Sequence, residues 1–397
     1  MPWAILNRSL RELRAEAAKL DVPPYGWTAG TRDTQDDRSV FDMNFGCRTI
    51  VQATRRSAVL GLLLFAGWCA AQPASGPATL ERVRAAGALR CGIDAEEAEY
   101  STADDHGNRA AFDADLCRAV AVAVLGKDAK VAVKPYPDDA GLMAALTGGE
   151  VDMTPTLTDD FTHTAGTHLA FTRPVLWDGV GFLLLEPSKV AHARELSGKK
   201  ICFLAETSVE ESVRVWFARE RLDFVPFPFQ EEGEMQAAFA TGNCGALAGE
   251  RTRLTQTGAA LLPHGTHTRL LPESIGKDPL AAAFRDDDPQ WRTLVSWVME
   301  ALVAAEEGGI QQANVRALAA RAQQDSDPAR RFLLGGSHQV GNALGLDNDW
   351  VARVIEAVGN YGEIYERALG NGSARKLPRG VNRLYRDGGL LQALPPR

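Results

Sequence analysis

Six cysteines and seven histidines are the residues of this chain with the most obvious chemistry. Two of the cysteines lie in or before an apolar N-terminal segment, and four follow it. No two cysteines have the Cys-x-x-Cys spacing of a zinc ribbon or a thioredoxin-like site. An even number of cysteines in an exported chain is compatible with two disulfides, and the alternative is four buried free thiols. The four cysteines concerned are Cys91, Cys117, Cys202 and Cys244.

The histidines do not form a metal-binding pattern. His163 and His168 are five residues apart, and His264 and His267 are three apart in a stretch with glycine and proline. Neither pair has a convincing third ligand, whereas a protein zinc site has three or four. We therefore expect no metal and no cofactor.

Thr207 and Ser208 stand between two predicted elements. A strand is expected over residues 201–204, and a helix begins near Glu210. The first N–H groups of a helix have no partner within it, so such a position suits a carboxylate ligand. Simple N-capping is the alternative, and the two roles are compatible.

Strands and helices alternate along the chain from Thr79 onward, which is typical of an α/β fold with a mostly parallel sheet. The first elements expected are strands at residues 89–93, 131–135 and 151–153 and helices at 112–125 and 142–146. Residues 171–174 are expected to form a turn that leaves Arg173 exposed.

A second unit begins after Gly179. Its expected elements are strands at residues 180–185, 201–204, 224–229 and 245–248 and helices at 210–220 and 232–241. A helix with one apolar face follows at 291–307, and residues 335–397 resemble an appended cap of helices and glycine-rich turns. With these elements, a Cys91–Cys117 disulfide would tie the first strand to the next helix, and Cys202–Cys244 would tie two strands of the second unit.

The N-terminal region has the layout of a secretory signal. Arg55 and Arg56 precede an apolar run at residues 58–68, and small residues follow it. More than fifty residues come before this signal, so we expect Met43 to be the true start. Residues 1–42 would then not belong to the mature protein, and residues 43–76 would be the signal region. The formal net charge of −8 gives no basic surface for nucleic acid.

Several motifs resemble those of the general L-amino-acid-binding component of bacterial ABC transporters, within the extracellular solute-binding protein family 3. The resemblance covers residues 79–397, and the order and spacing of the motifs are more specific than any one of them. The motifs are Cys91-Gly92-Ile93, Phe112-Asp113-Ala114-Asp115-Leu116-Cys117, Gly148-Gly149-Glu150-Val151-Asp152, Trp177-Asp178-Gly179-Val180-Gly181-Phe182, Asp349-Trp350-Val351, Val358-Gly359-Asn360-Tyr361-Gly362-Glu363 and Gly388-Gly389-Leu390.

The resemblance implies a periplasmic-binding-protein-like fold of two α/β lobes joined by two crossovers. Lobe 1 would comprise residues 79–178 and 272–330, lobe 2 residues 179–271, and a C-terminal extension packed on the lobes residues 331–397. It also implies a periplasmic monomer that has no catalytic residues. Such a protein binds a small polar ligand, an amino acid above all, and presents it to the permease subunits of an ABC importer.

The same resemblance implies the ligand-binding residues. Tyr100, Thr156 and Thr158 stand where the family contacts its ligand, as do Thr207 and Ser208. Two charged positions differ. His163 replaces the family's carboxylate-binding arginine and cannot form a bidentate fork, while Glu250 replaces its ammonium-binding aspartate. Glu206 also stands where a glycine is usual. These departures predict an altered ligand pocket.

Two other functions are compatible with these residues. Periplasmic dehydratases share the fold, and His163 with Glu250 or Glu206 could act as an acid–base pair. A sensor or binding module without transport is the second. The enzyme alternative has no nucleophile triad or metal set to support it. No transmembrane helix is expected after the lobes, so a sensor would have to signal through a separate protein.

Overall fold

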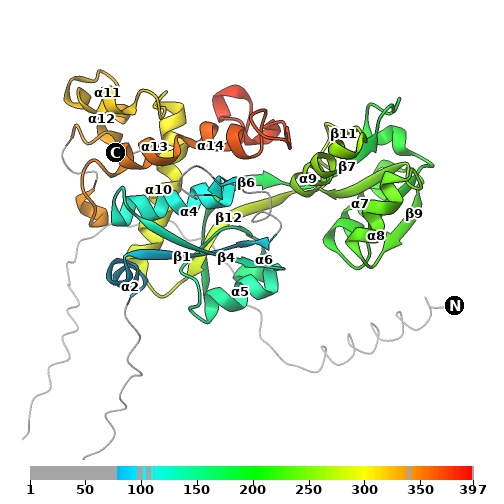
Figure 1. Cartoon of the computed structure of the whole chain (residues 1–397), viewed down its shortest axis with the longest axis horizontal. Coiled ribbons are helices and arrows are strands. Elements are labelled where there is room, and N and C mark those ends of the chain that lie inside the picture. The colour runs from blue at the N-terminus through cyan, green and yellow to red at the C-terminus, as the bar shows by residue number, and fades with distance from the viewer. Residues whose placement is uncertain (1–77, 96–101, 104–108, 111, 338–340, 396–397) are drawn as a thin grey trace, which may run out of the picture. The chain divides into compact units, whose positions relative to one another are not determined.

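The computed structural model describes residues 78–95, 102–103, 109–110, 112–337 and 341–395 (Figure 1). All of them belong to one compact unit, Ala71–Arg397. The predicted signal region, the expected start at Met43 and the proposed ligand contact Tyr100 lie outside the described residues. Within the described part of the chain, no helix has the length and apolar character to cross a membrane.

The first lobe is built on two small sheets. Strand β1 pairs in parallel with β4, and Cys91 of β1 forms a further parallel bridge to Met153. The other sheet has the order β5-β12-β6 and is wholly antiparallel. The strands are β1 (Ala88–Asp94), β4 (Lys130–Tyr136), β5 (Thr154–Thr158), β6 (Leu169–Asp178) and β12 (Asp278–Arg285), with a short pair β2 (Thr102–Ala103) and β3 (Arg109–Ala110). The helices of this lobe are α2 (Thr79–Ala86), α4 (Phe112–Leu125), α5 (Asp139–Thr147), α6 (Phe161–Thr164) and α10 (Pro289–Glu307).

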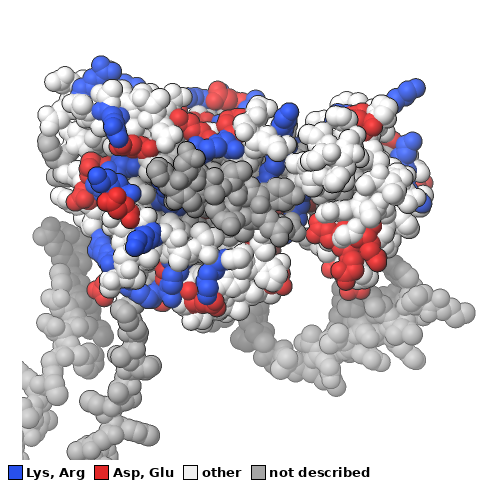
Figure 2. Space-filling model, in the orientation of Figure 1, with Lys and Arg blue, Asp and Glu red and all other residues white. Residues whose placement is uncertain are grey.

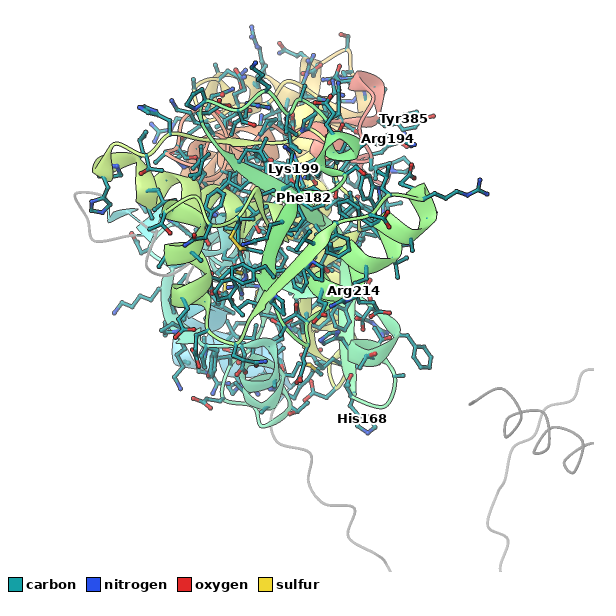
Figure 3. The ribbon with its side chains drawn as sticks, turned by 90° about the vertical axis from the view of Figure 1, so that its right-hand side faces the viewer. His168, Phe182, Arg194, Lys199, Arg214 and Tyr385 are labelled. Atoms are coloured by element: carbon teal, nitrogen blue, oxygen red, sulfur yellow. A yellow bond between two sulfur atoms is a disulfide. The ribbon has the colours of Figure 1, made fainter. Side chains whose placement is uncertain are left out.

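The second lobe is one five-stranded sheet with the order β11-β7-β10-β8-β9. Strands β10, β8 and β9 run parallel, while β7 and β11 are antiparallel to their neighbours. Its strands are β7 (Val180–Leu185), β8 (Lys200–Leu204), β9 (Val225–Phe229), β10 (Ala246–Glu250) and β11 (Thr268–Leu270). Its helices are η1 (Ala193–Leu196), α7 (Ser208–Glu220), α8 (Glu232–Ala240), α9 (Arg251–Leu261) and η2 (Leu262–His264). Phe182 of β7 points into the core of this lobe, whereas Arg194 and Arg214 point outward (Figure 3).

The chain passes from one lobe to the other twice, between β6 and β7 and between β11 and β12. These connections require strands that the sequence did not indicate. The turn predicted at residues 171–174 is wrong, because β6 continues through it. Pro174 is tolerated because β6 is an edge strand and its register against β12 shifts at this point. Gly179 stands at the first connection, where a Cβ atom would lie 2.4 Å from the Gly276 carbonyl oxygen.

The C-terminal helices complete the core of the first lobe (Figure 1). Trp350 of α13 and Tyr361 and Tyr365 of α14 are fully buried in the core that holds Phe112 of α4. The Phe112 ring meets both tyrosine rings edge-on, at 6.0 and 6.4 Å between centroids. The elements of this region are α11 (Val315–Ala319), η3 (Ala322–Gln324), α12 (Pro328–Leu333), η4 (Asn342–Leu344), α13 (Trp350–Val358), α14 (Tyr361–Ala368), η5 (Gly380–Asn382) and η6 (Tyr385–Asp387).

Asn382 attaches the C-terminal segment to the first crossover. Its side-chain oxygen accepts a hydrogen bond from the Trp177 N–H at 2.7 Å, and its amide nitrogen donates to the Trp177 carbonyl at 2.8 Å. Asn382 is buried. The amide therefore replaces a neighbouring strand along the free edge of β6.

Both predicted disulfides are present. Cys91–Cys117 joins β1 to α4 with 6.3 Å between Cα atoms, and Cys202–Cys244 joins β8 to the segment just before β10 with 5.7 Å. The alternative of four free thiols is therefore wrong. In the chain-entropy model each closed loop stabilises the fold by about 3–4 kcal/mol.

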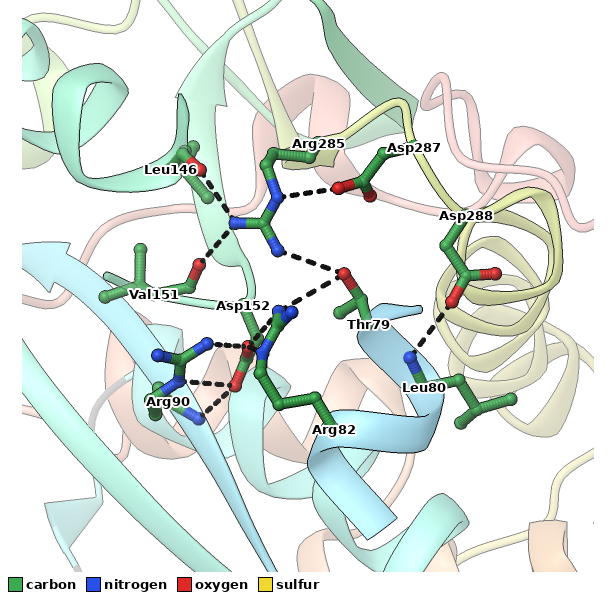
Figure 4. Close-up of polar contacts among 10 residues, drawn as sticks. All are labelled: Thr79, Leu80, Arg82, Arg90, Leu146, Val151, Asp152, Arg285, Asp287 and Asp288. Carbon is green, nitrogen blue, oxygen red and sulfur yellow. Dashed lines mark hydrogen bonds and ion pairs between the residues drawn. The ribbon is translucent and has the colours of Figure 1, made fainter. Parts of the chain in front are cut away.

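A buried carboxylate connects the elements that begin the first lobe (Figure 4). Asp152 is 1% exposed and accepts hydrogen bonds from the guanidinium groups of Arg82 and Arg90, at 2.7 and 2.6 Å, and from the Arg90 N–H at 2.9 Å. Burial opposes ionisation of Asp152, but these hydrogen bonds outweigh it and lower its pKa. Helix α2, strand β1 and the start of β5 are therefore held at one point.

Charges of both signs are interspersed on the face of the first lobe that Figure 2 shows, and acidic side chains gather on one part of the second lobe. No extended basic area is visible among the described residues on this face.

Candidate functional site

A cavity of about 300 Å³ is lined by residues of both lobes. The first lobe contributes Asp94 at the end of β1, Thr156 in β5 and Asp278 at the start of β12, and the second contributes Glu250 at the end of β10 and Arg253 in α9. Strand ends meet here, which is where open α/β sheets place their ligands. We take this cavity as the candidate ligand site and call it the Glu250 cavity.

The structure brings three of the predicted site residues to this cavity: Thr156, Thr158 and Glu250. The two threonines lie within strand β5, whereas the sequence had placed them just after a strand. The Thr156 hydroxyl group lies 2.9 and 2.8 Å from the two carboxylate oxygens of Asp113, to which it donates. The Thr158 side chain hydrogen-bonds Asp278.

Thr207 and Ser208 line a neighbouring cavity of about 300 Å³ that shares Glu250 and Arg253 with the first. Thr207 is the N-cap of α7, and its hydroxyl oxygen accepts a hydrogen bond from the Glu210 N–H at 3.4 Å. The capping role is thus present in the structure. The carboxylate-binding role of Thr207 and Ser208 stays a prediction.

His163 is the predicted site residue that does not line the Glu250 cavity or its neighbour. Its Nδ1 lies 2.8 Å from the carboxylate of Asp160, the residue that caps α6. His163 also interacts electrostatically with Asp139, which does line the Glu250 cavity. Its ligand-binding role stays a prediction.

Glu206 adopts a left-handed backbone conformation, with φ of 60°. Side chains other than glycine, asparagine and aspartate rarely adopt this conformation, which accounts for the glycine that the family resemblance places here. The Glu206 N–H donates to the Glu210 carboxylate at 2.9 Å. The glutamate is therefore accommodated with backbone strain at the start of α7.

Arg253 is a site residue that the sequence analysis missed. Its Nε donates to Glu250 at 3.0 Å, and its Nη2 donates to Asp94 of the first lobe at 3.0 Å. The i,i+3 spacing of Glu250 and Arg253 is the available sequence signal, since residues so spaced are neighbours on a helix. The contact with Asp94, 159 residues away, leaves no trace in the sequence.

Two carboxyl groups of the cavity have strongly raised pKa values. Burial raises the pKa of Glu250 to about 7, and the nearby Asp178 and Asp278 add to the increase against the attraction of Arg253. Burial likewise raises the pKa of Asp278 to about 6, although the Thr158 hydrogen bond opposes it. The Oδ1 atom of Asp278 is buried without a hydrogen-bond partner. These groups are poised to accept a positively charged or hydrogen-donating ligand.

A larger cavity, of about 840 Å³, lies between α12 and the C-terminal residues of the described chain. It is lined mainly by the segment from Asp327 to Leu333 and by Ala393, Leu394 and Pro395. It receives no residue from the second lobe. Among the residues that the structure describes, no group of three or more His, Cys, Asp or Glu side chains is placed to hold a metal ion.

Comparison with known proteins shows close relatives along nearly the whole chain. The general L-amino acid-binding periplasmic protein AapJ of Rhizobium johnstonii is 38% identical over 345 residues, which are 86% of this chain and 98% of the relative. The glutamate/glutamine/aspartate/asparagine-binding protein BztA of Rhodobacter capsulatus is 35% identical over 86% of this chain and 100% of its own length. The chain belongs to the family of amino-acid-binding proteins of ABC transporters. No protein-family model matches it.

Among solved structures, a periplasmic binding protein of an ABC transporter from Brucella ovis, with glutathione bound, superposes with a TM-score of 0.69. It is 35% identical and covers 81% of this chain and 99% of its own. The predicted two-lobed fold is thus confirmed. The relatives are named as binding proteins, which confirms the prediction that the chain is not an enzyme and does not favour the dehydratase alternative.

Proposed function

We propose that the chain binds an amino acid or a related small polar solute in the Glu250 cavity and delivers it to the permease subunits of an ABC importer. The observation that carries this proposal is that charged and polar side chains from both lobes line the same cavity. Two lobes joined by two strand connections can close around a ligand by hinge motion. Closure would bury the solute and create the surface that the permease recognises.

We further propose that the protein acts in the periplasm as a monomer, after removal of an N-terminal signal. The relatives support the location, since AapJ is named as periplasmic, and the two disulfides suit an oxidising compartment. The proposed lobes are residues 79–178 with 272–330, and residues 179–271, with an extension at 331–397.

We also propose that the ligand pocket is altered relative to its family. The carboxylate-binding arginine is replaced by His163, and the arginine that does line the cavity is already paired with two carboxylates. Of the ligands named for the relatives, glutathione, glutamate and aspartate carry a carboxylate in addition to the one that every amino acid has. A histidine at position 163 cannot offer such a ligand the bidentate contact that an arginine makes.

Isothermal titration and thermal-shift screening of the purified protein against the twenty amino acids and glutathione test both proposals. Ligand binding to the folded state increases the free energy of unfolding by RT ln(1 + [L]/Kd) and thereby raises the melting temperature. We expect at least one amino acid to bind, and His163→Arg to raise the affinity for glutamine or glutamate about tenfold by restoring a bidentate contact.

His168→Arg is the matched control, because His168 lies five residues away and is exposed. It should leave every affinity unchanged. Binding of no amino acid would contradict the proposed function. An unchanged or lower affinity of His163→Arg would contradict only the proposed alteration at His163.

A further inference from the structure

The Glu250 cavity is lined by six carboxylates and one cationic side chain among the described residues. Arg253 is that cation, and its two carboxylate partners, Glu250 and Asp94, lie on opposite lobes. Its charge is therefore already balanced within the protein. The remaining carboxylates come from the first lobe: Asp113, Asp138, Asp139 and Asp278.

The four remaining carboxylates differ in the hydrogen bonds that they accept from the rest of the protein. Asp113 accepts from the Thr156 hydroxyl group, and Asp138 caps helix α5 through the Gly141 N–H at 2.7 Å. The Oδ1 atom of Asp278 is buried without a hydrogen-bond partner, whereas Asp139 is exposed at the start of α5. A buried anionic oxygen without a donor is costly, so Asp278 favours a ligand that donates a hydrogen bond, and the exposed carboxylate of Asp139 lines the same cavity.

We infer that the ligand of the Glu250 cavity carries more positive than negative charge, as a basic amino acid does, with its side-chain ammonium or guanidinium group at Asp139 and Asp278. This inference rests on the proposed function and specifies the class of solute. A basic amino acid supplies two cationic groups, and its single carboxylate can use the N–H groups at the start of α7, beside Thr207 and Ser208.

The electrostatics of the cavity agree with this class of ligand. Burial of Glu250 and Asp278 raises the pKa of each, and Asp178, Asp139 and Asp160 reinforce the increase at Asp278. A bound cation would lower both pKa values, because opposite charge favours the ionised carboxylate. A further anion would raise them and would be repelled.

Calorimetric titration of the full chain at low ionic strength with lysine, arginine, glutamine, glutamate and glutathione tests the inference. We expect lysine or arginine to bind at least about tenfold more tightly than glutamine and glutamate. Asp139→Asn should lower the affinity for the basic amino acid about tenfold and leave that for glutamine within about twofold. Asp139 is exposed, so the substitution is not expected to disturb folding.

Asp128→Asn is the matched control, since Asp128 is an exposed carboxylate of the same lobe outside the cavity. It should bind every solute as the wild type does. Tighter binding of glutamate or glutathione than of lysine and arginine would overturn the charge preference and leave the proposed function intact. Equal losses in Asp139→Asn and Asp128→Asn would overturn it as well. Absence of binding by any solute would contradict both proposals.

Discussion

Glu250 ends strand β10 with its carboxylate 3.0 Å from Arg253, yet its pKa is raised to about 7. Burial is the main cause, and the attraction of one guanidinium group does not compensate it. A carboxyl group whose pKa is higher in the folded than in the unfolded chain binds its proton more tightly when folded. Its contribution to stability is complete below the unfolded value of 4.5 and is lost as the pH rises through 7.

The free energy of unfolding of the unliganded protein should therefore decrease between about pH 4.5 and pH 7. Glu250→Gln should remove this contribution to the pH dependence. Melting temperatures measured every half unit from pH 5 to pH 8 give the comparison. The difference between wild type and Glu250→Gln should be most favourable to the wild type at pH 5 and should shrink toward pH 8. Glu211→Gln, at an exposed position of α7, is the control and should track the wild type. A constant difference across the range would show that Glu250 does not titrate there.

For single residues, the sequence predicts which side chains reach the site better than it predicts which residues they contact there. Thr156, Thr158 and Glu250 reach the cavity as expected. Arg253 was missed because its importance comes from Asp94, on a distant strand. Glu206 could be noticed as unusual, but the left-handed backbone that makes it unusual is visible only in the structure.

Helix α2, strand β1 and the start of β5 depend on the buried carboxylate of Asp152 (Figure 4). Asp152→Ala should lower the free energy of unfolding by about 3–5 kcal/mol, because it leaves two arginines without their shared partner in a part-buried site. Urea unfolding followed by circular dichroism measures the loss. Asp287→Ala is the matched control, since Asp287 pairs with Arg285 at 2.9 Å in the same region but its side chain is 54% exposed. Similar losses from both substitutions would contradict the role assigned to Asp152.

The helices and the parallel strands followed their sequence patterns closely. Helix α4 covers residues 112–125 as expected, and the expected helix at 291–307 begins two residues earlier, after the cap Asp288. The antiparallel strands β5, β6 and β12 were missed. Their pairing is non-local, and Pro174 and a register shift obscure the two-residue alternation that normally indicates a strand.

On the scale of the whole molecule, the crossover strand β6 is held on one side by β12 and on the other by Asn382. Asn382→Ala should cost about 1–3 kcal/mol of stability, because it leaves the Trp177 N–H and carbonyl groups without partners. It should also alter ligand affinity, since Trp177 directly precedes the connection at which the lobes would move. Unfolding and titration with the best ligand measure the two effects.

Asn243→Ala serves as the control, because Asn243 is exposed in the second lobe and its side chain donates a hydrogen bond only to the nearby Thr241 among the described residues. It should change neither stability nor affinity appreciably. A stability loss in Asn382→Ala with an unchanged ligand affinity would restrict Asn382 to a structural role. The two-lobed organisation itself was predictable from the order of the motifs, whereas this attachment was not, because it joins residues 205 positions apart.

The burial of Trp350, Tyr361 and Tyr365 against Phe112 has a consequence for biogenesis. The hydrophobic core that includes residue 80 cannot be fully packed until residue 365 has left the ribosome. The core of the first lobe would therefore stay incomplete during nearly the whole synthesis of the chain.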